Sequence, residues 1–302
     1  MTSRRIPAER TGPVTIDAAL LGYAGTITVR AEPDCERATL TIRTADEEGE
    51  AADLVRDATL RQSGTGGLYV SAQGKGANET AIIATGGRHV VQSIGVVTGS
   101  VTGMMIIGND VIVNGAHISA NGGGATAIKG GSPIEITAIV PEGSSVIGRT
   151  HSAHIVAEGA LLNVTGHTQS GHISAGHVAR VLASTLFGHV VVERAAHISA
   201  TAQGGNLNLG RTDVVEARTV GGDIRIRDFG GTAQLETVGG DIRVHATVGG
   251  TITARTVGGD IEVTATEAAL DDSLDIQTNT MGGRVRTPQG RRPSGGPRRR
   301  SL

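Results

Sequence analysis

Aliphatic and polar residues alternate in short segments of this chain, and the segments recur at a fixed spacing between residues 218 and 263. In GDIRVHA, the aliphatic residues Ile242, Val244 and Ala246 take every second position, and polar residues lie between them. Such alternation is typical of a β-strand with one buried and one solvated face. Glycine pairs separate the segments in steps of 9, 9, 10 and 9 residues, at Gly221–Gly222, Gly230–Gly231, Gly239–Gly240, Gly249–Gly250 and Gly258–Gly259. A period this short predicts a solenoid of stacked strands and turns.

The same register continues upstream of these copies. The residue between the turn and the first aliphatic residue forms a column: His117, His154, His172, His189, Asn206, Asp223, Asp241 and Asp260. Its steps are 37, 18, 17, 17, 17, 18 and 19 residues, so the first step corresponds to two coils and each other step to one. We therefore predict an all-β fold, a single-chain parallel β-solenoid with coils of about 18 residues, each made of two strands and two turns. The glycines are expected to supply the positive φ angles of the turns.

The pattern divides the chain into four parts. Residues 1–13 are expected to be a flexible N-terminus, and residues 14–87 a β-rich cap that covers the first coil, with one helical turn near residues 51–57. Residues 88–287 form the solenoid, with an insertion in residues 264–287 before the last coil. From His89 onward there is room for roughly ten coils and a rod about 50 Å long. Residues 288–302 are Arg-rich and punctuated by Pro and Gly, which predicts a disordered tail.

Composition narrows the class of protein. The four aromatic residues, Tyr23, Tyr69, Phe187 and Phe229, are too few for a conventional globular core. The net charge of −2 gives no global attraction to a charged polymer. Cys35 is the only cysteine, which excludes an intramolecular disulfide and is compatible with a reducing compartment. Without an apolar run that could form a signal peptide or a transmembrane segment, we expect a cytoplasmic protein.

The histidine column is the first candidate for a metal site. His154, His172 and His189 would stack about 4.8 Å apart, and imidazoles so placed could share zinc or nickel. No Cys or carboxylate accompanies them in the motif, so a solvated polar ladder is the favoured interpretation.

The aspartate column is the second candidate. Calcium-binding nonapeptides need a third glycine and a later aspartate, whereas Asp223, Asp241 and Asp260 follow the glycine pair directly. Neighbouring arginines are expected to neutralise the stacked carboxylates: Arg225, Arg227, Arg243 and Arg255. We therefore predict no metal, cofactor-binding or catalytic residue.

The sequence also lacks a catalytic motif. The chain has no G-x-S-x-G and no Walker A sequence, and its His and Asp recur as repeats where an active site is usually a single exception. Polysaccharide lyases and hydrolases with β-helical folds have longer coils, large loops and aromatic platforms for sugar. We therefore expect neither an enzyme nor a small-molecule substrate. The Arg-rich tail would make only weak, salt-sensitive contact with an anionic partner.

The GGDI-plus-aliphatic coils resemble the bacterial putative adhesin family of β-strand-repeat proteins, a domain of unknown function that is common in actinobacteria. The stretches TITVRAEP, ATLTIRTAD and LYVSA are similar to the opening of those proteins, so the resemblance covers most of residues 14–285. It implies the solenoid shape and carries no catalytic residues. A weaker similarity links the chain to bactofilins, which polymerise end to end.

Three hypotheses of function follow. The first is a non-enzymatic cytoplasmic scaffold or interaction protein that presents repeated polar rows to a protein partner or to another copy. The second is an exported, adhesin-like module that binds a surface. The third is a bactofilin-like filament in which terminal coils stack end to end.

Overall fold

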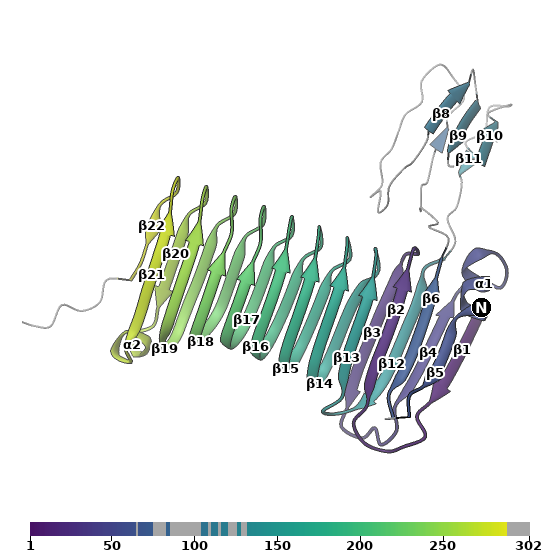
Figure 1. Cartoon of the computed structure of the whole chain (residues 1–302), viewed down its shortest axis with the longest axis horizontal. Helices are drawn as coiled ribbons and strands as arrows, with labels where there is room; N and C mark the ends of the chain where they lie inside the picture. The colour runs from purple at the N-terminus through teal and green to yellow at the C-terminus, as the bar shows by residue number, and fades with distance from the viewer. Residues whose placement is uncertain are drawn as a thin grey trace, which may run out of the picture.

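The computed structural model describes residues 1–64, 66–74 and 132–288, together with the backbone of five short strands between residues 83 and 127. The chain winds into a stack of flattened coils (Figure 1). Each coil contributes one segment to a first sheet and one to a second sheet, and aliphatic side chains fill the space between the two sheets. The predicted β-solenoid is therefore confirmed.

The regular part of the solenoid consists of six long strands that pass through the first sheet, bend, and continue in the second. These are β14 (His154–Thr168), β15 (Ile173–Thr185), β16 (Val190–Ala202), β17 (Leu207–Arg218), β18 (Ile224–Glu236) and β19 (Ile242–Thr256). They pair in parallel in the predicted register, with Ile155 opposite Ile173, Ile173 opposite Val190, and Val190 opposite Leu207. A turn that ends in glycine then leads each coil into the next, and from β16 onward this turn carries a glycine pair.

The C-terminal coil contains the predicted insertion, which is helical. β20 (Ile261–Ala265) continues the first sheet, and β21 (Leu274–Thr280) continues the second sheet beside β19. The helix α2 (Glu267–Asp271) takes the place of the bend, and the Thr266 side chain caps it by accepting the backbone N–H of Ala269. The short strand β22 (Val285–Arg286) then pairs with β20.

The N-terminal part of the solenoid is interleaved from two distant segments. The first segment contains β1 (Thr2–Pro7), β2 (Thr15–Leu21), β3 (Gly25–Glu32), β4 (Thr39–Thr44), α1 (Glu50–Asp57), β5 (Thr59–Gln62) and β6 (Leu68–Gln73). The second contains β12 (Ile134–Pro141) and β13 (Ser145–Thr150). The first sheet has the order β1–β4–β12–β3–β14, and the second has the order β5–β6–β2–β13–β14. β12 therefore lies between two strands of the first segment, and β13 lies between β2 and the regular strand β14.

This arrangement corrects the predicted division of the N-terminal region. Residues 2–7 form β1 and are not a flexible leader, because their backbone pairs antiparallel with β4. β2 and β3 are not a separate cap, because β2 pairs with β13 of the second segment and β3 lies between β12 and the regular strand β14. The predicted helical turn is the eight-residue helix α1, which buries Ala51, Ala52 and Val55 against the N-terminal end of the core.

Residues 88–131 do not supply the predicted coils where the structure describes them. β8 (Met104–Ile107), β9 (Asp110–Val113) and β10 (Ala116–Ser119) form an antiparallel sheet of their own, and β7 (Ile83–Ala84) pairs with β11 (Thr126–Ala127). His117 lies in β10, so its predicted place in the solenoid column is wrong. The rest of this predicted stretch, and the predicted tail beyond residue 288, lie outside the described residues.

The core is thin and almost wholly aliphatic. Ile242, Val244 and Ala246 are buried, as their alternation predicts, and the first inward position of every regular coil is fully buried. Phe229 is the largest fully buried side chain and fills the bend of β18. Tyr23 is the second aromatic side chain buried in the core. The rest of the core is aliphatic, because two sheets of β-branched side chains can close over one another at this spacing.

Candidate functional site

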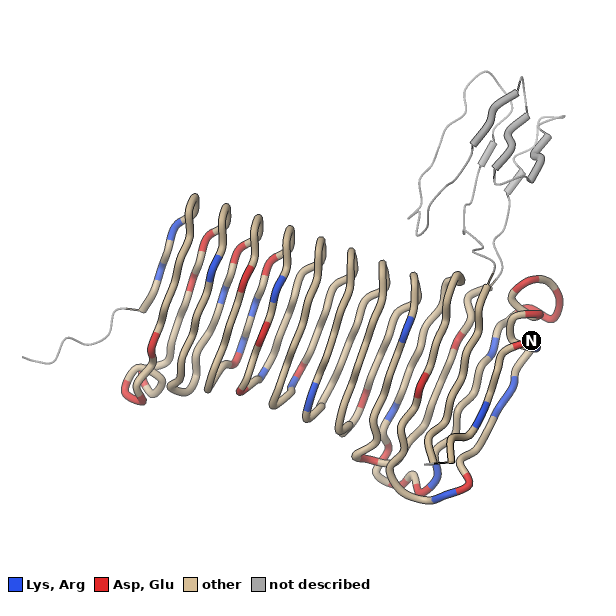
Figure 2. Tube along the Cα trace, viewed as in Figure 1, with Lys and Arg blue, Asp and Glu red and all other residues tan. Residues whose placement is uncertain are grey.

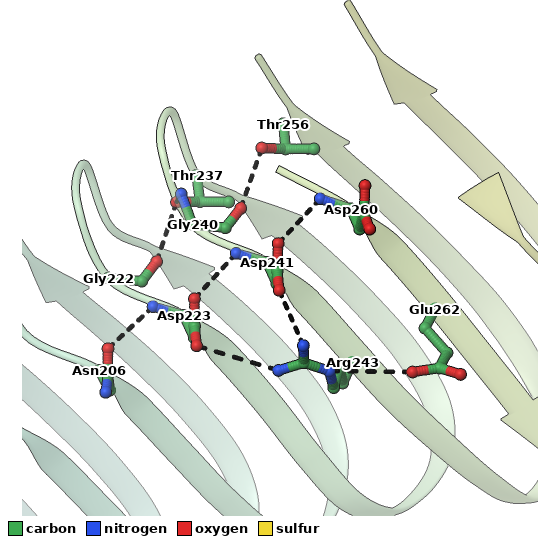
Figure 3. A network of polar contacts seen from close by, with 10 residues as sticks. All are labelled: Asn206, Gly222, Asp223, Thr237, Gly240, Asp241, Arg243, Thr256, Asp260 and Glu262. Atoms are coloured by element: carbon green, nitrogen blue, oxygen red, sulfur yellow. Dashed lines mark hydrogen bonds and ion pairs between the residues drawn. The ribbon is translucent and has the colours of Figure 1, made fainter. Parts of the chain in front are cut away.

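The main candidate site is the polar ladder, the column that opens each coil in the first sheet. It consists of His154, His172, His189, Asn206, Asp223, Asp241 and Asp260. Each side chain accepts a hydrogen bond from the backbone N–H of the next ladder residue, at 2.9 to 3.0 Å, and Asp260 accepts from Arg284 N–H at 2.7 Å. Figure 3 shows this chain of contacts from Asn206 to Asp260. Histidine, asparagine and aspartate recur in the column because each offers an acceptor within reach of that N–H.

The three histidines of the ladder share one hydrogen-bonding arrangement. Their Nδ1 atoms are the acceptors, so the ring proton lies on Nε2 and the imidazoles are neutral. Neighbouring rings stack with centroids 5.0 Å apart and planes 13° apart. Desolvation by burial, followed by the charges that His154 and His189 would carry, lowers the pKa of the middle residue His172 below its ordinary value. Acid would therefore work against the ladder.

This geometry does not suit a shared metal ion. Stacked rings direct their Nε2 atoms side by side, while a metal needs ligand atoms that converge on one point about 2.0–2.1 Å away. Nδ1 is already occupied by the backbone. Among the described residues, no three His, Cys, Asp or Glu side chains come together in a way that could hold a metal ion.

Two aspartates of the ladder, Asp223 and Asp241, are engaged on both carboxylate oxygens. Oδ1 of Asp223 and Asp241 accepts the backbone N–H, while the Oδ2 atoms face Arg243. The Arg243 guanidinium lies 2.8 Å from Asp241, 3.9 Å from Asp223 and 3.8 Å from Glu262 (Figure 3). One arginine therefore bridges three coils and relieves the repulsion between stacked carboxylates. The other predicted neutralising arginines, Arg225, Arg227 and Arg255, make no ion pair with the aspartates in the described ranges.

A second, buried ladder explains the recurring T-x-G-G turn. Thr237 Oγ1 donates to Gly222 O at 3.0 Å on the preceding coil and accepts the backbone N–H of Gly240 within its own turn at 3.3 Å. Thr219, Thr256 and Thr280 repeat both contacts (the bond from Thr256 to Gly240 is drawn in Figure 3). The sequence showed the recurring threonine but not its two partners.

The second glycine of each such turn is required by close stacking. A Cβ on Gly240 would lie 1.9 Å from Gly222 O on the preceding coil, where no atom can fit. Gly240 has no positive φ, so the predicted reason for the glycines of these turns is wrong. A positive φ occurs instead at the opposite bend, at Gly231 and Gly250.

With this geometry established, comparison with known proteins places the chain in a family. A family model described as Toastrack DUF4097 matches residues 54–294, which is most of the sequence. The chain belongs to the Toastrack family. The resemblance to a bacterial β-strand-repeat domain of unknown function, predicted from the GGDI coils, is thereby confirmed. No curated protein matches the chain.

Several solved structures resemble this Toastrack chain at low sequence identity. A putative adhesin from Parabacteroides merdae ATCC 43184 is 13% identical, with a TM-score of 0.46 over 95% of this chain and 96% of that one. A putative adhesin from Bacteroides fragilis NCTC 9343 is 13% identical, with a TM-score of 0.41 over 94% and 96% of the two chains. A third, from Parabacteroides distasonis ATCC 8503, is 12% identical, with a TM-score of 0.42 over 94% and 95%.

The Toastrack coils also carry an exposed apolar edge that sequence reasoning missed. We call the residues Val220, Val238, Val257 and Met281 the turn row, because each occupies the second position of a T-x-G-G turn. Backbone bonds connect them from coil to coil, for example Val238 N–H to Val220 O at 3.2 Å. The valines are 47–54% exposed and Met281 is 84% exposed. These turns line the edge drawn at the top of Figure 1. The valine that recurs directly after the turn threonine was the available signal in the sequence.

His151 lies in a turn, and its Nδ1 accepts the backbone N–H of Gly22 at 3.2 Å, which ties the interleaved strands to the regular coils. The arginines of the tail lie outside the described residues. Both helices in the described ranges are too short to traverse a lipid bilayer.

Proposed function

We propose that this Toastrack protein is a non-enzymatic interaction protein that presents the edge of its solenoid to another protein, with self-association as the first form to test. The turn row is the single observation that carries this proposal. An isolated exposed aliphatic residue is ordinary, but a contiguous apolar row on a soluble protein marks a contact surface. Here four consecutive coils repeat an exposed aliphatic residue at strand spacing, while their inward aliphatics are buried.

The chemistry of the polar ladder supports the non-enzymatic part of the proposal. Histidine and aspartate are the residues most often used in acid–base catalysis. In the ladder, their acceptor atoms are committed to backbone N–H groups of the next coil, so they act as structural caps. A substrate-specific activity that survives changes in the turn row and is lost with one ladder residue would overturn this part.

Sedimentation velocity over a concentration series tests the turn row. The variant carries Val220→Thr, Val238→Thr and Val257→Thr, which keep the β-branched shape and add a hydroxyl to each exposed side chain. We expect the wild type to associate with increasing concentration. The dissociation constant of the triple variant should be at least about tenfold higher. Val248→Thr is the matched control, because Val248 is 50% exposed but lies in the opposite bend of β19.

The outcomes of this experiment separate the forms of interaction. Wild-type rods that stay separate at every concentration would overturn self-association. Association that the control weakens as much as the triple variant would show that the turn row is not the surface. Negative-stain electron microscopy of the same samples distinguishes short assemblies from filaments of constant width.

The filament hypothesis meets an obstacle at the N-terminal end. α1 closes this end of the core with buried side chains of Ala51, Ala52 and Val55, so another copy could stack there only after α1 moved away. Localisation remains a prediction. Cell fractionation that finds the protein outside the cell would favour the adhesin-like hypothesis over a cytoplasmic scaffold.

A further inference from the structure

A groove runs over the bends of the regular coils, at the edge opposite the turn row, and onto the adjoining outer face of the second sheet. Three adjoining hollows of about 390, 320 and 370 Å³ lie along β14 to β18. The first two share Ala179 and Ala196, and the last two share Arg180 and His197, so they form one surface. We call this surface the bend groove and define it by its cationic and imidazole side chains: His177, Arg180, Arg194, His197 and Arg211.

These side chains are stacked in register. His177 lies opposite Arg194, and Arg194 lies opposite Arg211, on adjacent strands. Arg180 lies opposite His197 in the neighbouring column. Adjacent strands are about 4.8 Å apart, so like charges at these positions repel each other by roughly 1 kcal/mol in water.

The groove carries a net positive charge, with three arginines against the two carboxylates that line its hollows. Arg180 and Arg194 make no ion pair with any residue in the described ranges, and Arg211 is 3.9 Å from Asp228. Charged residues are sparse on the middle coils and denser toward the C-terminal coils (Figure 2). Asp213 and Glu216 lie on β17, and the third hollow extends past them to Thr232 and Gln234 on β18. An anionic partner would therefore gain charge-assisted contacts that the chain itself does not provide.

Exposed aliphatic side chains lie beside the arginines in the same groove. Leu162, Leu182 and Val214 are 50%, 46% and 42% exposed and line the second and third hollows. Ala179 and Ala196 keep the space between the long side chains open. The surface thus offers cationic and apolar contacts in alternation, which matches a segment that carries both carboxylate and aliphatic side chains.

We propose that the bend groove binds an extended acidic and aliphatic peptide segment of a partner protein. This inference rests on the proposed interaction function and names the chemistry of one partner. The interval from His177 to Arg211 is about 10 Å, which matches about three residues of an extended chain. Single-stranded nucleic acid fits less well, because no Phe, Tyr or Trp lines the hollows for base stacking and the net charge of −2 opposes long-range attraction of a polyanion.

Fluorescence anisotropy with the full-length protein tests this proposal. The probe is a labelled peptide of sequence GELEVELEG. Three control probes accompany it. The peptide GKLKVKLKG has the opposite charge, the peptide GESETESEG has no aliphatic residues, and a short oligothymidylate represents nucleic acid. The groove variant carries Arg180→Gln and Arg194→Gln. The control carries Arg225→Gln and Arg227→Gln on β18, two exposed arginines without an ion pair in the described ranges that lie outside the groove.

We expect GELEVELEG to bind the wild type and the control equally, and to bind the groove variant about tenfold more weakly. Reversal of the peptide's charges, or removal of its aliphatic residues, should weaken binding to the wild type. Circular dichroism and the melting temperature show whether the groove variant remains folded. Equal binding to both double variants, or no binding of GELEVELEG to the wild type, would overturn the proposal. Tighter binding of the oligothymidylate, lost in the groove variant, would replace the peptide with nucleic acid.

The substitutions that test the bend groove and the turn row do not overlap. Failure of the peptide to bind would leave the sedimentation result for the turn row unchanged. Failure of the turn-row variant to alter association would overturn the proposed function without changing the peptide measurement.

Discussion

The interleaved N-terminal coils and the regular coils have the same two-sheet architecture, but they reach it by different routes. In the regular coils each strand pairs with the strand that follows it in the sequence, 17 to 19 residues later. In the interleaved part, Ile27 pairs with Ile136 on one side and with Ile155 on the other. The comparison shows that a stack of identical cross-section can be built either by local repetition or by long-range insertion.

The difference has consequences for folding. Local repetition allows coils to form in succession, with each coil stabilised mainly by its neighbours. Interleaving requires two segments to meet across a long intervening chain. Closing this loop costs conformational entropy before the contacts between the segments can compensate for it. We expect the regular coils to respond locally to substitutions and the interleaved coils to respond together.

The largest expected effect comes from the turn glycines of the regular coils. Gly240→Ala would place a Cβ 1.9 Å from Gly222 O and force two coils apart, at a cost of more than about 4 kcal/mol in the free energy of unfolding. Gly239→Ala is the matched control, because its Cβ would meet Val220 O at 3.7 Å, an ordinary contact. Urea denaturation measures both. Equal effects at the two positions would contradict the stacking argument.

The next effect separates the two regions directly. Ile27→Ala and Ile224→Ala each remove a fully buried side chain, and each should cost about 3 kcal/mol. Hydrogen exchange should distinguish them. Ile27→Ala should expose the amides of β12 and β14 together, while Ile224→Ala should expose only β17 to β19.

If Ile27→Ala accelerated hydrogen exchange only at amides near position 27, this result would contradict the interleaved arrangement. Exchange that spreads over the whole solenoid after Ile224→Ala would contradict the local response of the regular coils.

The same contrast explains what the sequence could predict. The register of the regular coils was visible because Ile224, Ile242 and Ile261 repeat at the spacing of the strands they pair with. The position of β3 between β12 and β14 has no such signal, since no local period links Ile27 with Ile136. The polar ladder was visible as a column of residues, but its hydrogen bonds were not, because they depend on the backbone of the next coil.

The histidines of the ladder give a smaller, pH-dependent effect within the regular coils. His172→Leu leaves the N–H of His189 without its acceptor and should cost about 1–2 kcal/mol at pH 8. His172→Asn should retain most of the stability, because Asn206 already acts as an acceptor in the same column.

The pKa of His172 is lowered in the folded protein, so the unfolded chain binds a proton more readily. The contribution of His172 is therefore complete above the ordinary histidine pKa of about 6.5 and declines as the pH falls below it. His154 and His189, which stack on either side of His172, are the titratable groups that face it. Urea denaturation between pH 8 and pH 5 should show a smaller loss of stability for His172→Asn than for the wild type. A larger loss in the variant would contradict the neutral ladder.

The smallest expected effect concerns a buried threonine of the regular coils whose hydroxyl has no hydrogen-bond partner in the part of the chain that the structure describes. Thr212 lies in the bend of β17 opposite Phe229, and its buried Oγ1 is the one side-chain polar atom without a hydrogen-bond partner among the buried atoms of the described residues. Thr212→Val removes this unpaired hydroxyl at nearly constant shape and should raise the free energy of unfolding by about 1 kcal/mol. Thr219→Val is the matched control, since Thr219 Oγ1 donates to Gly205 O at 3.1 Å and accepts from Gly222 N–H at 3.3 Å. The same substitution should therefore destabilise the protein at 219 and stabilise it at 212, which thermal unfolding of the two variants measures.

Changes of the same sign would show that the hydrogen-bonding difference between these buried threonines does not determine their contribution to stability. Opposite signs would show that the repeat dictates where a threonine must lie in the turn and leaves the bend free to vary.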